Sequence, residues 1–121
     1  METRGLLGAW GEVQAAEYLR KKRYRVIARN VHCRGGEIDL IAEDRRYVVF
    51  VEVKTRKNAA FAEAREFVDG HKQARLRLAA EYWLATQETD KQPRFDVIEV
   101  YAPEGAATKK PEIRHWESAF E

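Results

Sequence analysis

Apolar residues recur at helical spacing in two stretches of the chain. Within residues 6–22 they are Leu6, Ala9, Val13, Ala16 and Leu19, which would line one side of a helix. Within residues 69–87 the same spacing returns with Leu76, Ala79, Ala80, Trp83 and Leu84. The first stretch ends in the basic run "RKKR", and the helix dipole favours positive charge at that end. The pattern predicts two amphipathic helices.

Strand-like runs lie between and after these helices, at residues 24–32, 37–44, 48–56 and 94–102. The turn signals "RGG" and "EDRR" separate the first three runs, which are expected to form a meander. Residues 111–120, "PEIRHWESAF", offer a weaker fifth strand, and residues 55–66 are predicted to form a mobile loop with at most a short helical piece. The resulting αβββαβ order predicts one α/β domain over residues 1–121, with a central mixed sheet flanked by two helices.

Charged residues interrupt the apolar face of two predicted strands. Side chains alternate along a strand, so Glu52 and Lys54 share the face of Val48 and Phe50. In the preceding strand, Asp39 lies within the apolar run "IDLI", where an unpaired carboxylate is costly. The same alternation groups Asp39 with Glu37 and Ile41, opposite Ile38, Leu40 and Ala42.

The two predicted helices also direct charge toward the interior. Glu12 lies between Gly8 and Ala16 on the stripe that should pack on the sheet. Lys72 precedes Leu76 on the apolar stripe of the second helix. Four separate elements therefore each send an ionisable group toward the core.

Two explanations fit this convergence. Separate buried ion pairs, such as Glu52 with Lys54 or Asp39 with Lys72, would serve only the fold. Alternatively, because three carboxylates leave excess negative charge, a divalent cation would neutralise it, and Mg²⁺ (or Mn²⁺) favours such hard oxygen ligands. A metal held by Asp39 and Glu52 would leave Lys54 beside the attacking water and a phosphate oxygen. That arrangement suits metal-assisted hydrolysis of a phosphodiester.

Amino-acid composition excludes several classes of protein. The 121 residues carry 22 basic and 20 acidic side chains, so the net charge of +2 is far below that of a purely electrostatic nucleic-acid binder. Cys33 is the single cysteine, which excludes an intrachain disulfide and a Cys-based zinc cluster. No apolar run approaches the ~20 residues of a membrane span, and residues 1–13 carry the acids Glu2 and Glu12 and no signal-peptide h-region. We expect a cytoplasmic protein with no membrane contact.

Four segments together resemble a known family: "GEVQAAEYL" (residues 11–19), "GEIDLIA" (36–42), "FVEVKTR" (50–56) and "RFDVIEV" (94–100). They resemble the YraN-like family of small bacterial proteins. That family is grouped with the PD-(D/E)XK restriction-endonuclease-like superfamily and is similar to archaeal Holliday-junction resolvases. The resemblance extends from about Gly5 to about Tyr101.

The resemblance implies a role for each charged residue. Asp39 and Glu52 would be metal ligands, Lys54 the catalytic lysine, and Glu12 a helix acid that completes or extends the metal site. Lys72 would lie at the edge of the substrate channel. One position departs from the superfamily motif, because Ile38 stands where the proline of its name is found.

Three functions remain open on the sequence alone. The first is a metal-dependent nuclease acting on branched or damaged DNA, and the second is a nucleic-acid-binding protein that keeps the fold without catalysis. The third is an interaction protein whose buried charges only fix the fold. Candidate phosphate contacts are Arg56, Lys57, Lys72 and Arg75, while "RKKRYR" (residues 20–25) is equally explained as a solvated surface. A homodimer is plausible, since cutting two strands usually needs two active sites.

Overall fold

The computed structural model describes residues 5–57 and 70–120 and confirms the predicted αβββαβ order. The fifth strand is also present. The segment predicted as a loop begins later than expected, because Thr55 and Arg56 belong to β3, and residues 58–66 lie outside the described residues. The elements are α1 (Gly5–Lys21), β1 (Arg25–Cys33), β2 (Gly36–Glu43), β3 (Tyr47–Arg56), α2 (Gly70–Ala85), β4 (Gln92–Tyr101), the 3₁₀ turn η2 (Gly105–Ala107) and β5 (Glu112–Phe120).

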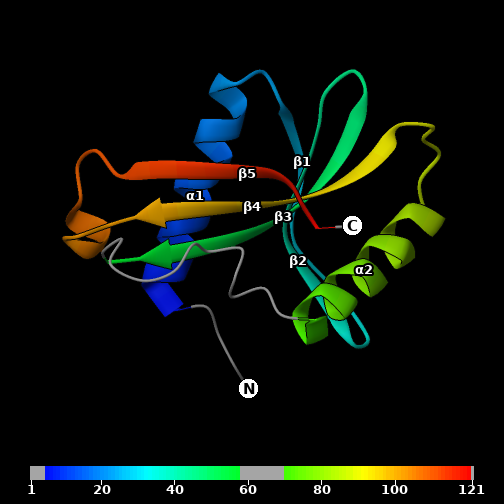
Figure 1. Ribbon diagram of the computed structural model, residues 1–121, viewed down its shortest axis with the longest axis horizontal. Helices are drawn as coiled ribbons and strands as arrows, with labels where there is room; N and C mark the ends of the chain where they lie inside the picture. Colours follow the sequence, from blue (N-terminus) through cyan, green and yellow to red (C-terminus); the bar gives the residue numbers. More distant parts are fainter. Residues whose placement is uncertain (1–4, 58–69, 121) are drawn as a thin grey trace.

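The described strands form one mixed sheet in the order β1-β2-β3-β4-β5. Only β3 and β4 are parallel, and the chain between them contains α2, because a parallel connection needs a crossover. The other neighbours are antiparallel. The β1–β2 hairpin runs steeply across the direction of β3, β4 and β5 (Figure 1).

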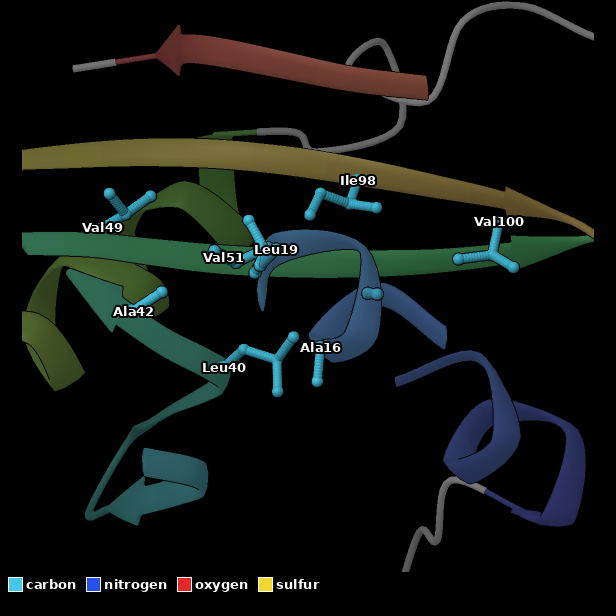
Figure 2. Close-up of a cluster of buried hydrophobic side chains, with 9 residues drawn as sticks. Ala16, Leu19, Leu40, Ala42, Val49, Val51, Ile98 and Val100 are labelled. Carbon is cyan, nitrogen blue, oxygen red and sulfur yellow. The ribbon is translucent and has the colours of Figure 1, made fainter. Parts of the chain in front are cut away.

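Each helix covers a different face of the sheet. Ala16 and Leu19 of α1 pack against Leu40, Val51 and Ile98, with further apolar side chains of β2, β3 and β4 around them (Figure 2). On the other face, α2 covers a second cluster of Ile38, Ile41, Val48, Phe50, Leu76, Ala79 and Ala80. Within the described residues, no helix is long and apolar enough to cross a membrane. The predicted central sheet between two helices is confirmed.

One face prediction is wrong. Ile38 packs with Ile41 under α2, whereas strict alternation placed it with Leu40 on the α1 face. The change of face falls at Asp39, although the Cα register of β1 and β2 is the same on both sides of it, Arg29↔Leu40 and Val31↔Ile38. Asn30, which lies between the two β1 partners, has a left-handed φ of 52°. The alternation of β2 is thus interrupted beside a non-glycine residue in the left-handed region.

The pairing of β2 with β3 is short, and this opens the sheet at one end. The paired residues run from Glu43↔Val48 to Leu40↔Val51, whereas β3 pairs with β4 along its whole length. Beyond Leu40, the first part of β2 pairs with β1 alone. The two strands therefore separate at Asp39 and Glu52, which are the next residues on either side.

Helix α2 packs closely on the sheet at Gly36, the first residue of β2. A Cβ at Gly36 would lie 2.4 Å from the carbonyl oxygen of Arg75 and 3.1 Å from the backbone nitrogen of Ala79. Because backbone atoms of a helix move little, we expect Gly36→Ala to lower the free energy of unfolding by about 2 kcal/mol. Gly70→Ala is the control, since a Cβ there meets nothing within 4 Å. Equal denaturant midpoints for the two variants would contradict this packing.

Candidate functional site

The separation of β2 and β3 leaves a cleft of about 460 Å³ that both helices border. Its acidic and basic side chains come from four elements. They are Glu12 of α1, Asp39 of β2, Glu52 and Lys54 of β3, and Lys72 of α2, with Leu7, Gly8, Val53 and Thr55 completing the lining. The structure thus brings the five charged residues singled out in the sequence into one cleft.

Asp39 lines this cleft where the β2–β3 ladder ends, a position named here the apex of the cleft. Its Oδ2 accepts a hydrogen bond of 2.8 Å from the backbone N–H of Val53, so the side chain joins the two strands where their ladder ends. Burial and then the negative charge of Glu52 raise the pKa of Asp39 to about 8, although the Val53 N–H opposes the shift. Glu12 and Glu37 raise this pKa further. The apex is therefore a site of unfavourable negative charge.

Glu52 is held by two lysines. Lys72 Nζ donates to Glu52 Oε2 at 3.2 Å, and Lys54 Nζ lies 3.4 Å from the same oxygen. The side chains of Glu52 and Lys54 are 14% and 20% exposed, while that of Lys72 is 44% exposed. The carboxylate and Lys54 are thus within the cleft, and Lys72 stands at its rim.

The two lysines differ in basicity. Burial lowers the pKa of Lys54, and the neighbouring Lys72 lowers it further, while Glu52 acts in the opposite direction. For Lys72, burial also acts to lower the pKa, but its hydrogen bond to Lys54 and the charge of Glu52 raise it overall. Lys54 is consequently the lysine that gives up its proton more readily.

Glu12 reaches the cleft because α1 lies close to β3. The neighbouring Gly11 has no side chain, and a Cβ there would lie 1.9 Å from Thr55 Oγ1. Glu12 itself is only 5% exposed and lines the same cleft as Asp39. Its charge also contributes to the raised pKa of Asp39, as a nearby acid should.

Comparison with known proteins places the chain among bacterial relatives. The model of the uncharacterised protein family UPF0102 matches residues 11–100, which include all five charged residues of the cleft. The chain belongs to the UPF0102 family. It is 42% identical to the UPF0102 protein of Geobacter metallireducens over 116 residues, covering 95% of this chain and 92% of that protein. The UPF0102 protein of Caldanaerobacter subterraneus subsp. tengcongensis is 44% identical over 116 residues, covering 94% and 93% of the two chains.

The carboxylates of this UPF0102 cleft fit a hard divalent cation better than a softer metal. Asp39, Glu52 and Glu12 offer oxygen ligands, and the described residues contribute no histidine or cysteine to the cleft lining. Within residues 5–57 and 70–120, no three His, Cys, Asp or Glu side chains are arranged to enclose a metal by themselves. Mg²⁺ does not need such a cage, because it commonly uses one or two carboxylates with waters and substrate phosphates.

The four basic residues predicted to contact phosphate lie at different places relative to the cleft. Lys57 is exposed just beyond β3, and Arg75 is exposed on α2 beside a small pocket that also includes Glu52 and Lys72. Arg56 does not line the cleft: its Nε lies 3.4 Å from Glu99 Oε2, which is fully buried. Of the predicted set, Lys72 and Arg75 therefore line a pocket together with Glu52, and nucleic-acid contact by all four stays a prediction.

Sequence reasoning missed a buried charge cluster on β4 and β5. Asp96 is fully buried and accepts hydrogen bonds from Arg94 at 2.8 and 2.9 Å and from the Ser118 backbone N–H at 3.0 Å. His115 Nε2 lies 2.7 Å from Asp96 Oδ2. Burial would raise the pKa of Asp96, but His115 and Arg94 lower it overall. The sequence "RFD" contained a signal for this cluster. Arg94 and Asp96 have opposite charges and are two residues apart, so they share one face of a strand.

The raised pKa of Asp39 predicts how stability varies with pH. A carboxyl in the unfolded chain has a pKa of about 4, so folded Asp39 keeps a proton that the unfolded chain has released. The free energy of unfolding in EDTA should therefore fall as the pH rises from about 4 to 8. Asp39→Asn should remove this contribution and stabilise the protein at pH 8 by at least about 1 kcal/mol.

Denaturant unfolding at several pH values checks this expectation. Asp90→Asn, which removes an exposed carboxyl from the turn after α2, is the matched control and should behave as the wild type. A loss of several kcal/mol in Asp39→Asn would instead show that Asp39 serves the scaffold as one member of a buried ion pair.

Proposed function

We propose that this UPF0102 protein is a metal-dependent nuclease that hydrolyses phosphodiester bonds in structured or damaged DNA. The observation that carries the proposal is the meeting of Asp39 and Glu52 at the end of the β2–β3 ladder, with Lys54 beside them in an open cleft. The αβββαβ core and the resemblance of "GEIDLIA" and "FVEVKTR" to the PD-(D/E)XK superfamily support the same reaction.

Each residue of the cleft has a chemical task in this proposal. Asp39 and Glu52 would hold Mg²⁺ or Mn²⁺, with Glu12 completing or extending the site. When bound, the cation supplies charge neutralisation for the phosphate and for the charge that develops on it. Lys54, whose pKa burial lowers, would orient the attacking water and take its proton. Lys72, at the rim, adds positive charge where a phosphate would enter.

A second candidate function is nucleic-acid binding without cleavage. It is favoured by the contacts of Glu52, whose Oε2 is approached by both Lys54 and Lys72. These two lysines balance the charge of Glu52 without any metal, which is how a fold that has lost catalysis would stabilise the same cleft. The two candidates differ in whether Mg²⁺ displaces these lysines.

The test is cleavage of branched, single-stranded and duplex DNA with Mg²⁺ or Mn²⁺, with DNA binding measured in parallel. We expect Glu52→Gln to abolish cleavage because it removes a ligand charge. Lys54→Met should lower the cleavage rate roughly 100-fold or more, since it removes a group for proton transfer. Both variants should still bind DNA.

Glu81→Gln is the matched control. Glu81 is an exposed acid on α2 that lines neither the Asp39 cleft nor the small pocket beside Glu52. It should cleave as the wild type does. DNA binding with no Mg²⁺-dependent cleavage of any substrate would overturn the nuclease proposal and favour the second candidate.

A further inference from the structure

A second hollow, of about 580 Å³, lies at the β2–β3 turn and the end of α1. Its lining is strongly basic, with only Glu43 and Asp44 as acids. Glu43 is already engaged, because Arg25 and Lys91 both donate to it. Asp44 Oδ1 accepts the backbone N–H groups of residues 46 and 47. The six cations, named here the basic patch, are Lys22, Arg23, Arg25, Arg45, Arg46 and Lys91.

Four members of the basic patch form no ion pair with an acid in the part of the chain that the structure describes. Lys22, Arg23, Arg45 and Arg46 are exposed, and among the described residues no carboxylate lies within ion-pair distance of them. They come from two segments, the end of α1 and the β2–β3 turn, which the fold places around one hollow. A concave surface with unbalanced positive charge concentrates anions.

Arg23 also has a backbone conformation that an arginine adopts at a cost. Its φ is 73°, in the left-handed region, and it directly follows the last turn of α1. The backbone N–H of Tyr24 bonds to the carbonyl of Leu19 at 3.0 Å, which is the helix-ending arrangement in which glycine is the usual residue at this position. Backbone conformation alone would favour glycine here, so the fold itself does not require an arginine side chain at this position.

We propose that the basic patch binds the phosphodiester backbone of a duplex arm whose scissile region lies in the Asp39 cleft. This inference rests on the proposed function, because it names a second contact for the same substrate. Helix α1 joins the two sites, with Gly8 at the cleft and Lys21 next to the patch. These residues are about 20 Å apart along the helix. That distance corresponds to roughly six base pairs of duplex.

The length of the duplex arm is therefore the variable to test. Fluorescence anisotropy in Ca²⁺ would compare DNA hairpins with stems of about four and about twelve base pairs over a range of salt concentrations. We expect Arg45→Ala/Arg46→Ala to weaken binding of the long stem roughly tenfold at low salt. The salt slope should fall by about 1 for each phosphate that the variant no longer neutralises. Binding of the short stem should change little.

Arg23→Gly separates a binding role from a structural one. Glycine is favoured at this left-handed position, so the variant should melt at the same or a higher temperature while binding the long stem less tightly. Lys109→Ala/Lys110→Ala is the charge-matched control, because it removes two exposed cations from the segment after η2. The control should bind as the wild type.

Several outcomes would overturn the proposal. Wild-type binding by the patch variants would do so, as would an equal weakening in the control, which would mean that only net charge matters. Patch-dependent binding to vesicles of anionic phospholipid, without DNA binding, would reassign the patch to a membrane surface.

The same variants distinguish the two proposals. If Glu52→Gln abolishes cleavage while the patch variants bind normally, the nuclease stands and the patch falls. If no substrate is cleaved but the patch variants no longer bind the long stem, the patch stands and the nuclease falls.

Discussion

The hydrogen bond from the Val53 backbone N–H to the Asp39 carboxyl is the contact on which this site depends. It forms where β2 and β3 stop pairing, so a side chain takes over from the ladder and satisfies a backbone group that the separating strands would otherwise leave without a partner. The separation creates the cleft, and the bond fixes one of its carboxyl groups at the apex. The core on either side then holds the two strands in place, since each helix packs on a different face.

This arrangement is unfavourable in one respect, because it brings the carboxyl groups of Asp39 and Glu52 close together where burial removes water. Glu52 is compensated by Lys54 and Lys72, whereas Asp39 keeps a raised pKa because burial and Glu52 disfavour its charge. The Asp96 cluster on the same sheet shows the opposite case, in which a buried carboxylate is fully neutralised by its neighbours. There, the buried acid has an arginine, a histidine and a backbone donor, and its pKa is lowered. The same fold thus neutralises Asp96 fully and leaves Asp39 poorly neutralised. A buried acid with such a perturbed pKa is typical of a functional site.

The sequence predicted the fold and the cleft because both follow from local periodicity. Alternation placed Glu52 and Lys54 on one strand face, and helical spacing placed Glu12 and Lys72 on the inner sides of two helices. It failed for Ile38, because the side chains of β2 change face at Asp39, beside the left-handed Asn30, and no pattern of apolar residues encodes such a change. The pairing of Arg56 with Glu99 and the assembly of the basic patch depend on contacts between distant segments, so local spacing could not supply them.

The most direct test of the account is where a divalent cation binds. Amide resonances of ¹⁵N-labelled protein would be followed as Mn²⁺ is added in substoichiometric amounts, because the paramagnetic ion broadens the signals of nuclei near it. A metal site at the end of the β2–β3 ladder predicts broadening centred on Val53 and Asp39 in the wild type and its loss in Asp39→Asn. Broadening centred on Glu43 and Asp44 at the opposite end of β2, or none at all, would contradict a metal site at the end of the β2–β3 ladder.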